Sequence, residues 1–151
     1  MPHMLIRSIL GVAALSAAGI GLAAEYSPRQ YYSGWQAYPQ TPQVAYRHYY
    51  YKPTPEYSGY KHNYVMKVPH DPEHLYYYNP YSKKYWGRCP IKTNGKPLYS
   101  LLAEKDRKAD LKAIPPSAFP APGPLPPLPE STDGARLDLP PDDLPMLGFQ
   151  K

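Results

Sequence analysis

The sequence predicts a mostly irregular or disordered chain. Its ordered part is a small tyrosine-rich antiparallel β element, a hairpin or meander, followed by one short α-helix, with no sizeable hydrophobic core. Three observations support this fold class. Tyrosine occurs 17 times against two phenylalanines and two tryptophans, and proline occurs 22 times. Aliphatic side chains are scarce between residues 26 and 97, where the Ile, Leu, Val and Phe residues are only Val44, Val65, Val68, Leu75 and Ile91. A conventional packed interior uses many more.

Residues 1–24 have the pattern of a secretory signal peptide. A short segment with a positive charge at Arg7 precedes an apolar run over 8–22, and small residues follow at the expected cleavage site, after either Ala23 or Ala24. A retained membrane anchor is the alternative, but the run is shorter than the roughly 20 residues of a spanning helix. We therefore expect a secreted, periplasmic or envelope protein with no transmembrane span after signal removal.

Residues 25–55 are expected to be loosely ordered. Tyrosine is mixed there with Gln, Ser and Gly, and five prolines prevent a continuous ladder of backbone hydrogen bonds. Residues 44–52 are the one candidate strand of this segment. Sixteen of the tyrosines lie between Tyr26 and Tyr85, so any core must be built from phenol rings. Because a buried hydroxyl needs a hydrogen bond or water, we expect that core to be thin and close to solvent.

Residues 56–97 are the predicted folded nucleus, a small tyrosine-rich β-hairpin region. Alternation of ring and polar side chains over 60–68 has the two-residue period of a strand. Residues 75–78 and 83–89 then resemble two arms of a hairpin around Asn79-Pro80-Tyr81-Ser82, which supplies turn chemistry.

Residues 98–114 are predicted to form the short helix, because Ser100 is a capping residue and the residues after it favour helix. Eleven prolines over 115–151 exclude regular helix or central strand there. We expect this acidic tail to be disordered or polyproline II.

Charge divides the mature chain. Residues 25–99 carry ten lysines and arginines against four acids, whereas residues 115–151 carry two basic residues against five acids. The two parts should attract each other weakly. A basic, tyrosine-rich surface suits an anionic envelope polymer or another surface protein as partner, with no specific nucleic acid, and ordinary solubilising charge is the alternative interpretation. No cofactor is expected.

The favoured function is a non-catalytic envelope or extracellular interaction or structural protein. The sequence has no Gly-rich phosphate loop, no G-x-S-x-G elbow and no H-E-x-x-H helix, so a hydrolase is the least favoured class. Display of amphipathic rings is typical of binding surfaces. The candidate surface residues are Tyr76, Tyr77, Tyr78, Tyr81, Lys83, Lys84, Tyr85, Trp86 and Arg88.

A metal- or redox-active binding protein is the alternative function. His70 and His74 would share a face only on a continuing helix, which Pro72 opposes. Cys89 is the only cysteine. It fits a reactive thiol, a Cys89-linked dimer, or a buried inert thiol.

Two resemblances bear on function. Tyr76-Tyr77-Tyr78-Asn79 with Trp86 and Pro90 resembles part of a WW domain, but the tryptophan stands one residue too early and the family's first tryptophan is absent. Four segments, 76–90 (YYYNPYSKKYWGRCP), 99–108 (YSLLAEKDRK), 114–123 (IPPSAFPAPG) and 139–145 (LPPDDLP), resemble uncharacterised short secreted Tyr/Pro-rich proteins of planctomycete-type bacteria. That resemblance implies secretion and supplies no catalytic residue.

Overall fold

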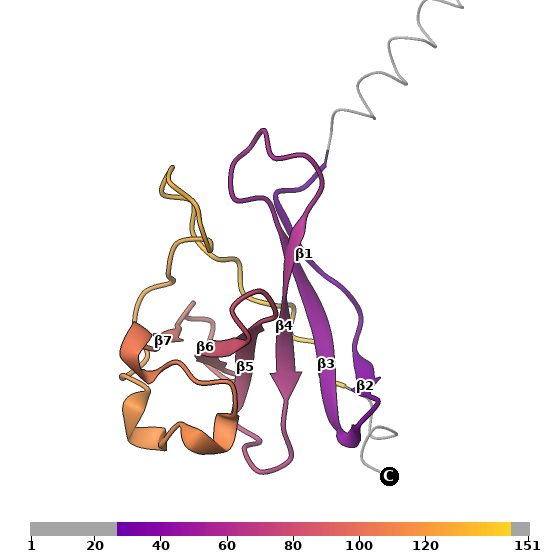
Figure 1. Cartoon of the computed structure of the whole chain (residues 1–151), viewed down its shortest axis with the longest axis vertical. Helices are drawn as coiled ribbons and strands as arrows, with labels where there is room; N and C mark the ends of the chain where they lie inside the picture. The colour runs from indigo at the N-terminus through magenta and orange to yellow at the C-terminus, as the bar shows by residue number, and fades with distance from the viewer. Residues whose placement is uncertain (1–26, 146–151) are drawn as a thin grey trace, which may run out of the picture.

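The computed structural model describes residues 27–145, which form one antiparallel β-sheet with connecting segments packed on both faces (Figure 1). The strands of this part of the chain are β1 (Gln30–Tyr32), β2 (Gln36–Tyr38), β3 (Thr41–Tyr51), β4 (Lys61–Lys67), β5 (His74–Asn79), β6 (Lys84–Pro90) and β7 (Ser100–Leu101). Three short 3-10 helices follow, η1 (Glu104–Asp106), η2 (Leu111–Ala113) and η3 (Pro116–Ala118). The predicted signal peptide, residues 1–24, lies outside the described residues.

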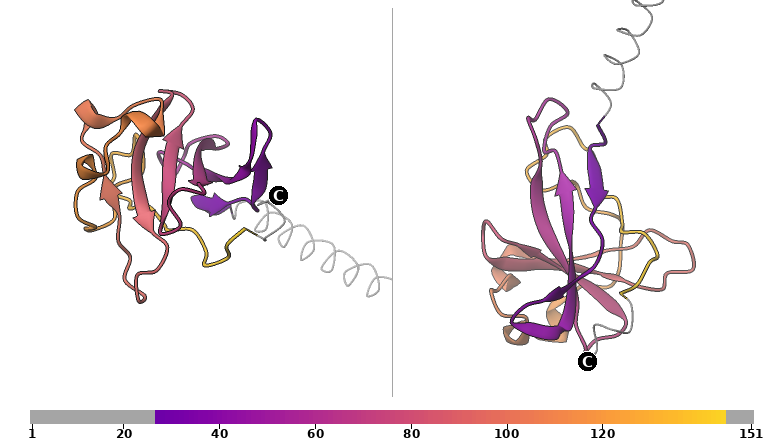
Figure 2. Two further views of the ribbon diagram at one scale, coloured as in Figure 1. Left: turned by 90° about the horizontal axis from the view of Figure 1, so that it is seen from below. Right: turned by 90° about the vertical axis from the view of Figure 1, so that its right-hand side faces the viewer.

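The strand order is β1-β3-β4-β5-β6-β7, and β2 also pairs with β3. Because β4 occupies the other side of β3, β1 and β2 are two consecutive pieces of the same edge. At the break between them, the Ser33 N–H donates to the His48 carbonyl over 2.9 Å, and the Ser33 hydroxyl accepts the His48 N–H over 2.8 Å. The sheet is strongly twisted, as the two further views show (Figure 2).

The strands expected over 44–52 and 60–68 and the hairpin over 75–89 are confirmed as β3, β4 and β5–β6. The Asn79 side chain builds the hairpin turn by accepting the Tyr81 N–H over 2.8 Å. The fold class as a whole is nevertheless wrong. The segment expected to be loosely ordered contributes three strands, and the chain is a mostly β fold around a buried aromatic cluster.

The predicted helix over 98–114 does not form. Its residues make β7 and two single 3-10 turns, η1 and η2. The backbone groups that a helix would use bond to other segments instead: the Leu102 N–H donates to the Trp86 carbonyl over 3.0 Å, and Tyr99 exchanges both backbone bonds with Gly123. Leu102 is thereby buried. Tertiary pairing has overridden a helix propensity of a few tenths of a kcal/mol per residue.

The predicted disorder of the proline-rich tail is also wrong for its described part. Residues 124–143, here called the strap, cross one face of the sheet and bury Leu128 and Leu137 against it. Pro127 and Arg136 form an isolated bridge within the strap. The prolines do exclude helix and regular strand, as expected. They do not exclude order, because the strap has a sheet to pack on.

The expected attraction between the basic and acidic parts takes the form of ion pairs to the strap. They are Arg29–Asp133 at 2.6 Å, Arg47–Asp143 at 2.9 Å and Lys61–Glu130 at 2.5 Å. The Asp133 and Glu130 side chains are more than one-third exposed, so these pairs contribute little individually. Arg47 differs, because its side chain is only 3 % exposed and also donates to the Ser33 carbonyl.

The main core lies under the strap, on what we call the strap face, and it is built mostly of rings. Tyr49 and Tyr77 are completely buried, with Trp86 and Tyr99 packed on them. Ring centroids lie 5.2 Å apart in edge-to-face contact for both Tyr77–Trp86 and Tyr77–Tyr99. A core of tyrosine was expected, but its depth was not.

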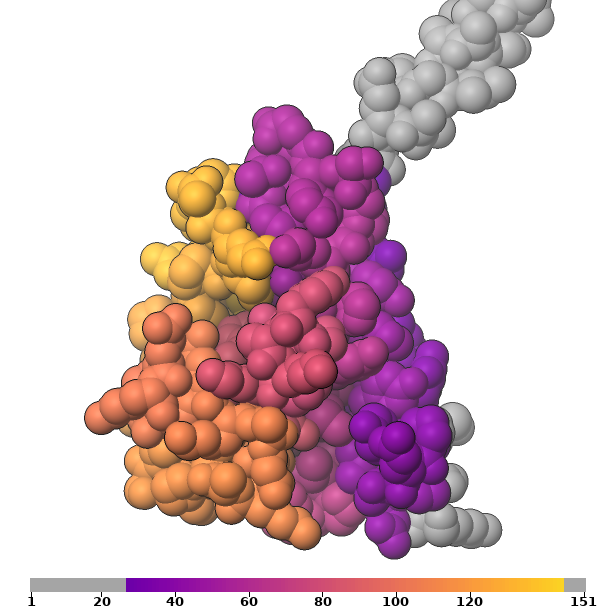
Figure 3. Space-filling model, viewed as in Figure 1, coloured from indigo at the N-terminus to yellow at the C-terminus, as the bar shows by residue number. Residues whose placement is uncertain are grey.

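The other face of the sheet bears Tyr46, His48 and Tyr50 of β3, and we call it the aromatic face. Over β5 and β6 it is covered by the η1–η3 segment, with Phe119 packed edge-to-face on Tyr76 at 5.7 Å. Over β3 and β4 its rings are half-buried and reach solvent. Figure 3 shows this side, with residues 104–119 at the lower left beside the strands.

Gly87 is the point where the core tolerates no side chain. A Cβ on this residue would overlap the ring and hydroxyl of Tyr99. Gly87→Ala should therefore lower the free energy of unfolding by about 1–3 kcal/mol, the usual cost of overpacking. Urea unfolding followed by circular dichroism measures it. Gly34→Ala, where nothing lies within 4 Å of the added methyl, is the matched control. Equal midpoints for the two variants would contradict this packing.

Candidate binding face and buried thiol

The residues predicted to form a binding surface do not lie together. Tyr76, Tyr77 and Trp86 are buried, at 4 %, 0 % and 6 % exposure. Tyr78, Tyr85 and Arg88 are half-buried, and Tyr81, Lys83 and Lys84 are exposed at the hairpin end. Tyr77 and Trp86 lie in the core under the strap, whereas Tyr76 points to the aromatic face and is buried there against Phe119. A register irregularity between Tyr77 and Tyr78 interrupts the alternation of β5.

The rings that do reach solvent come mainly from β1, β3 and β4. The aromatic strip, as we define it, consists of Tyr31, His48, Tyr50, Tyr60 and His62. Tyr31 and Tyr50 are stacked with centroids 4.8 Å apart, and Tyr50 and His48 are stacked at 5.4 Å. His48 lies 5.3 Å from His62, and Tyr31 meets Tyr60 edge-to-face at 4.9 Å. The strand patterns of β3 and β4 were the only sequence signal for this strip. They did not reveal it, because the strip forms only when the two strands pair side by side.

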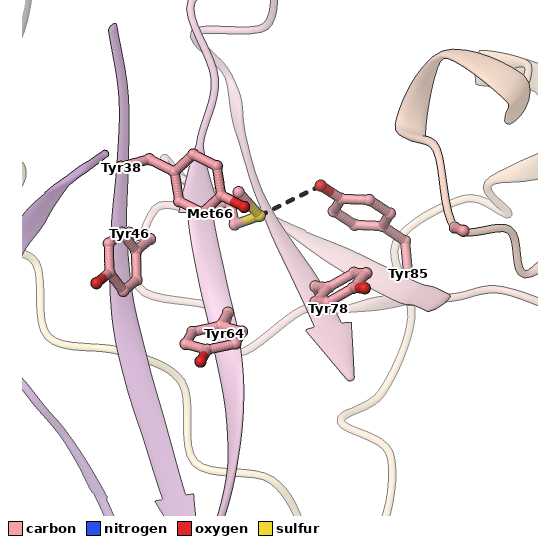
Figure 4. A pocket seen from close by; sticks show the side chains of 7 residues that line it. Tyr38, Tyr46, Tyr64, Met66, Tyr78 and Tyr85 are labelled. Atoms are coloured by element: carbon pink, nitrogen blue, oxygen red, sulfur yellow. Dashed lines mark hydrogen bonds between the residues drawn. The ribbon is translucent and has the colours of Figure 1, made fainter. Parts of the chain in front are cut away.

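A second group of rings encloses a pocket at the other end of the same face. The tyrosine cage, as we define it, consists of Tyr38, Tyr46, Tyr64, Tyr78 and Tyr85, one from each of the strands β2 to β6. Met66 and Ala109 complete the lining of a cavity of about 270 Å³. Figure 4 shows the rings arranged around Met66, whose sulfur accepts the Tyr85 hydroxyl at 3.2 Å.

The cage rings stand at steep angles to one another. Interplanar angles are 87° for Tyr38–Tyr46, 77° for Tyr46–Tyr64 and 61° for Tyr78–Tyr85, whereas Tyr64 and Tyr78 are near parallel at 26° with centroids 6.4 Å apart. Consecutive rings thus form the walls of a box rather than a flat platform.

Burial favours the neutral form of three side chains on the aromatic face, His48, Tyr64 and Tyr85. Desolvation, with a smaller contribution from His62, lowers the pKa of His48, so this imidazole loses its proton at a lower pH than an ordinary histidine does. Desolvation raises the pKa of Tyr85 to about 12 and also raises that of Tyr64. The phenols of Tyr64 and Tyr85 therefore keep their protons near neutral pH.

The two histidines predicted as metal ligands have different environments. His70 is exposed, while the His74 Nδ1 lies 3.0 Å from the Asp71 carboxylate. That carboxylate also accepts the Tyr76 hydroxyl and the Glu73 N–H, and it lies 3.8 Å from the Arg88 guanidinium. Among residues 27–145, no three His, Cys, Asp or Glu side chains are grouped as a metal site requires.

The Cys89 thiol is buried in the core under the strap, with the residue 2 % exposed. Desolvation raises its pKa to about 12, against the opposing hydrogen bond with Tyr77. Thiolate is the nucleophilic form, so this cysteine is inert in the folded protein. Of the alternatives that the sequence left open, the geometry matches the buried thiol.

In the part of the chain that the structure describes, no helix is long and apolar enough to cross a membrane.

The burial of Cys89 predicts slow reaction with an aromatic disulfide reagent. At pH 8 the native protein should react at least about 100-fold more slowly than protein unfolded in urea. In the native protein the reagent cannot reach the Cys89 sulfur, and little of the thiol is in its thiolate form. Absorbance of the released thiolate measures the rate, and Cys89→Ser gives the blank. Equal rates in the two states would contradict the buried position.

Asp71 predicts a loss of stability in acid. Burial acts to raise its pKa, but hydrogen bonds from Tyr76 and His74 outweigh it and lower the pKa from 3.8 to about 2. Its contribution is therefore complete above pH 4 and lost as the pH falls toward 2. Asp71→Asn should be roughly 1–2 kcal/mol less stable at pH 6, with the difference vanishing near pH 2. Urea unfolding at both pH values measures it, and Asp142→Asn, at an exposed carboxylate, is the control. A difference independent of pH would contradict this assignment.

Comparison with known proteins adds no functional assignment to this geometry. No protein-family model, curated protein or solved structure matches the chain. The function is therefore argued from the two faces of the sheet and their chemistry.

Proposed function

We propose that this is a secreted, non-catalytic interaction protein that docks on an anionic polymer of the cell envelope through the aromatic strip. The proposal combines the signal-peptide pattern of residues 1–24 with the ring surface on β1, β3 and β4. Another surface protein remains the competing kind of partner, and the experiment below separates the two.

The observation that carries the proposal is that two phenol hydroxyls of the strip have no partner in the described part of the chain, whereas those of Tyr46, Tyr60 and Tyr85 on the same face do. On the strap face the hydroxyls of Tyr32, Tyr49 and Tyr51 have protein partners, whereas the buried Tyr99 hydroxyl has none among residues 27–145. On the aromatic face the hydroxyls of Tyr31 and Tyr50 have none among residues 27–145, although Tyr31 is 40 % exposed. These phenols are free to donate to acceptors outside the protein.

The orientation of the rings favours an acceptor-rich partner over a flat apolar one. Tyr31, Tyr50 and His48 are stacked against one another, so each covers its neighbour's face. A ring whose faces are covered offers its edge, which is the positive part of the aromatic quadrupole. Carboxylate or phosphate groups on a polymer would meet positive ring edges and hydroxyl donors together.

Charge at the rim supports the same class of partner. Lys52 lies 5.0 Å from the Tyr60 ring and is available beside the strip. Lys83 and Lys84 are exposed on the β5–β6 hairpin. The formal net charge of the chain is +5, which draws anionic polymers toward the protein at low ionic strength.

The metal- or redox-active alternative gains no specific support. Its two histidines are apart, with His74 engaged by Asp71, and the Cys89 thiol is buried with a raised pKa. The binding role through the strip is therefore the function we propose.

Retention on cross-linked polyuronate beads tests the proposal, with uncharged dextran beads in parallel. We expect retention on polyuronate at low salt that weakens as salt is added, and little on dextran, because the contacts are charge-assisted. The double variant His48→Ala, Tyr50→Ala should bind about tenfold more weakly, as expected when interface rings are removed. Leu144→Ala is the control, because this side chain is 50 % exposed but lies on the strap side.

Retention of the double variant at the wild-type level, or equal retention on both kinds of bead, would contradict the proposal. Failure on every polymer together with stoichiometric capture of one purified surface protein would favour the competing partner.

A further inference from the structure

We propose that the tyrosine cage is a binding site for a quaternary ammonium group, such as a choline head group. The inference concerns the pocket at the Met66 end of the aromatic face and does not depend on polymer binding by the strip. It identifies the ligand by the chemistry of the pocket walls.

The number and arrangement of the rings are the first argument. One tyrosine from each of five strands lines the same cavity, and three of the four neighbouring pairs are steeply inclined, at 87°, 77° and 61° (Figure 4). The face of an aromatic ring is negative and attracts a cation within about 6 Å of its centroid. Several such faces around one cavity surround a cation on many sides, which is how quaternary ammonium groups are recognised.

The absence of competing groups in the lining is the second argument. The residues that line the cavity are five tyrosines, Met66 and Ala109, with no charged side chain. Two of the phenol hydroxyls already have protein partners, because Tyr46 donates to Gln36 over 2.9 Å and Tyr85 donates to the Met66 sulfur. A sugar would require several convergent hydrogen-bonding groups. A trimethylammonium group requires none, because its charge is spread over methyl groups.

Size and nearby charge agree with this class of ligand. A cavity of about 270 Å³ is small beside the roughly 300–1,000 Å³ of drug-sized sites, so it suits a compact head group. Asp110 follows Ala109 at the rim and is close enough to act on the pKa of Tyr85. Its carboxylate favours a cation over an anion at this end of the face. The Tyr85 N–H bond to the Lys108 carbonyl, at 2.8 Å, holds this rim against β6.

Calorimetric titration of the whole protein with choline tests the site. The decisive comparison is the neutral carbon analogue of choline, in which a quaternary carbon replaces the nitrogen at almost unchanged shape. We expect saturable binding of choline and at least about tenfold weaker binding of the carbon analogue, because only the cation interacts with the ring quadrupoles. Glucose should not bind in the cage.

Variants assign the binding to the cage. Tyr78→Leu should weaken choline binding about tenfold, whereas Tyr78→Phe, which keeps the ring, should leave it within about twofold. Tyr38→Leu on the edge strand β2 gives a second test if Tyr78→Leu does not fold. Tyr50→Leu removes a ring of the strip outside the cage and is the matched control.

Three results would overturn the inference: no saturable choline binding, equal binding of choline and its carbon analogue, or unchanged binding in both leucine variants of the cage. Polymer retention by the Tyr78→Leu protein separates this failure from a failure of the proposed function, because the strip is intact in that variant.

Discussion

The structure depends on one constraint, which is that a core made of tyrosine must find partners for its hydroxyl groups. A buried phenol without a hydrogen bond costs roughly 1–3 kcal/mol, so ring burial on this scale is favoured when hydrogen-bonding partners enter the core with the rings. Among residues 27–145 the Tyr99 hydroxyl is the one buried phenol of this core that has no such partner. Tyr32 and Tyr77 share a hydrogen bond of 2.7 Å, and Tyr32 donates to the Asp138 carbonyl over 2.6 Å. Tyr51 is bonded to Asn63, which also accepts the Trp86 indole N–H at 2.7 Å.

The proline-rich strap is suited to supply such acceptors. Proline has no N–H, and a chain outside the sheet leaves its carbonyls unpaired. Strap carbonyls accept from Tyr32, from the Trp35 indole and from the Gln30 side chain. The tyrosine-rich and proline-rich halves of the sequence therefore complement each other within one fold. The strap closes one face and the η1–η3 segment covers the other over β5 and β6. The accessible rings are therefore those over β3 and β4, where we expect recognition by this protein.

The sequence predicted individual strands well, because their evidence is local. Alternation over 60–68 and the turn residues at Asn79-Pro80 are read within a few positions, and both correspond to observed elements. The helix over 98–114 was wrong because its residues satisfy their backbone groups across the sheet, through Trp86 and Gly123. The candidate surface mixed buried and exposed residues, since the run Tyr76-Tyr77-Tyr78 does not reveal which ring faces the strap. The strip and the cage could not be predicted from the sequence, because each consists of residues from several strands that only sheet pairing brings together.

The sequence by itself determined that any core had to be tyrosine, that the tail could be neither helix nor regular strand, and that the two charged parts would attract. These follow from the chemistry of single residue types: the scarcity of aliphatic side chains, the missing N–H of proline and the sign of the charges. Only the tertiary structure decided that residues 115–145 of the tail are ordered, that the core is deep, and which rings remain in solvent. Those outcomes depend on contacts between segments far apart in the sequence, such as Leu137 with the Tyr49 cluster, where the gain from burying apolar surface outweighs local preference.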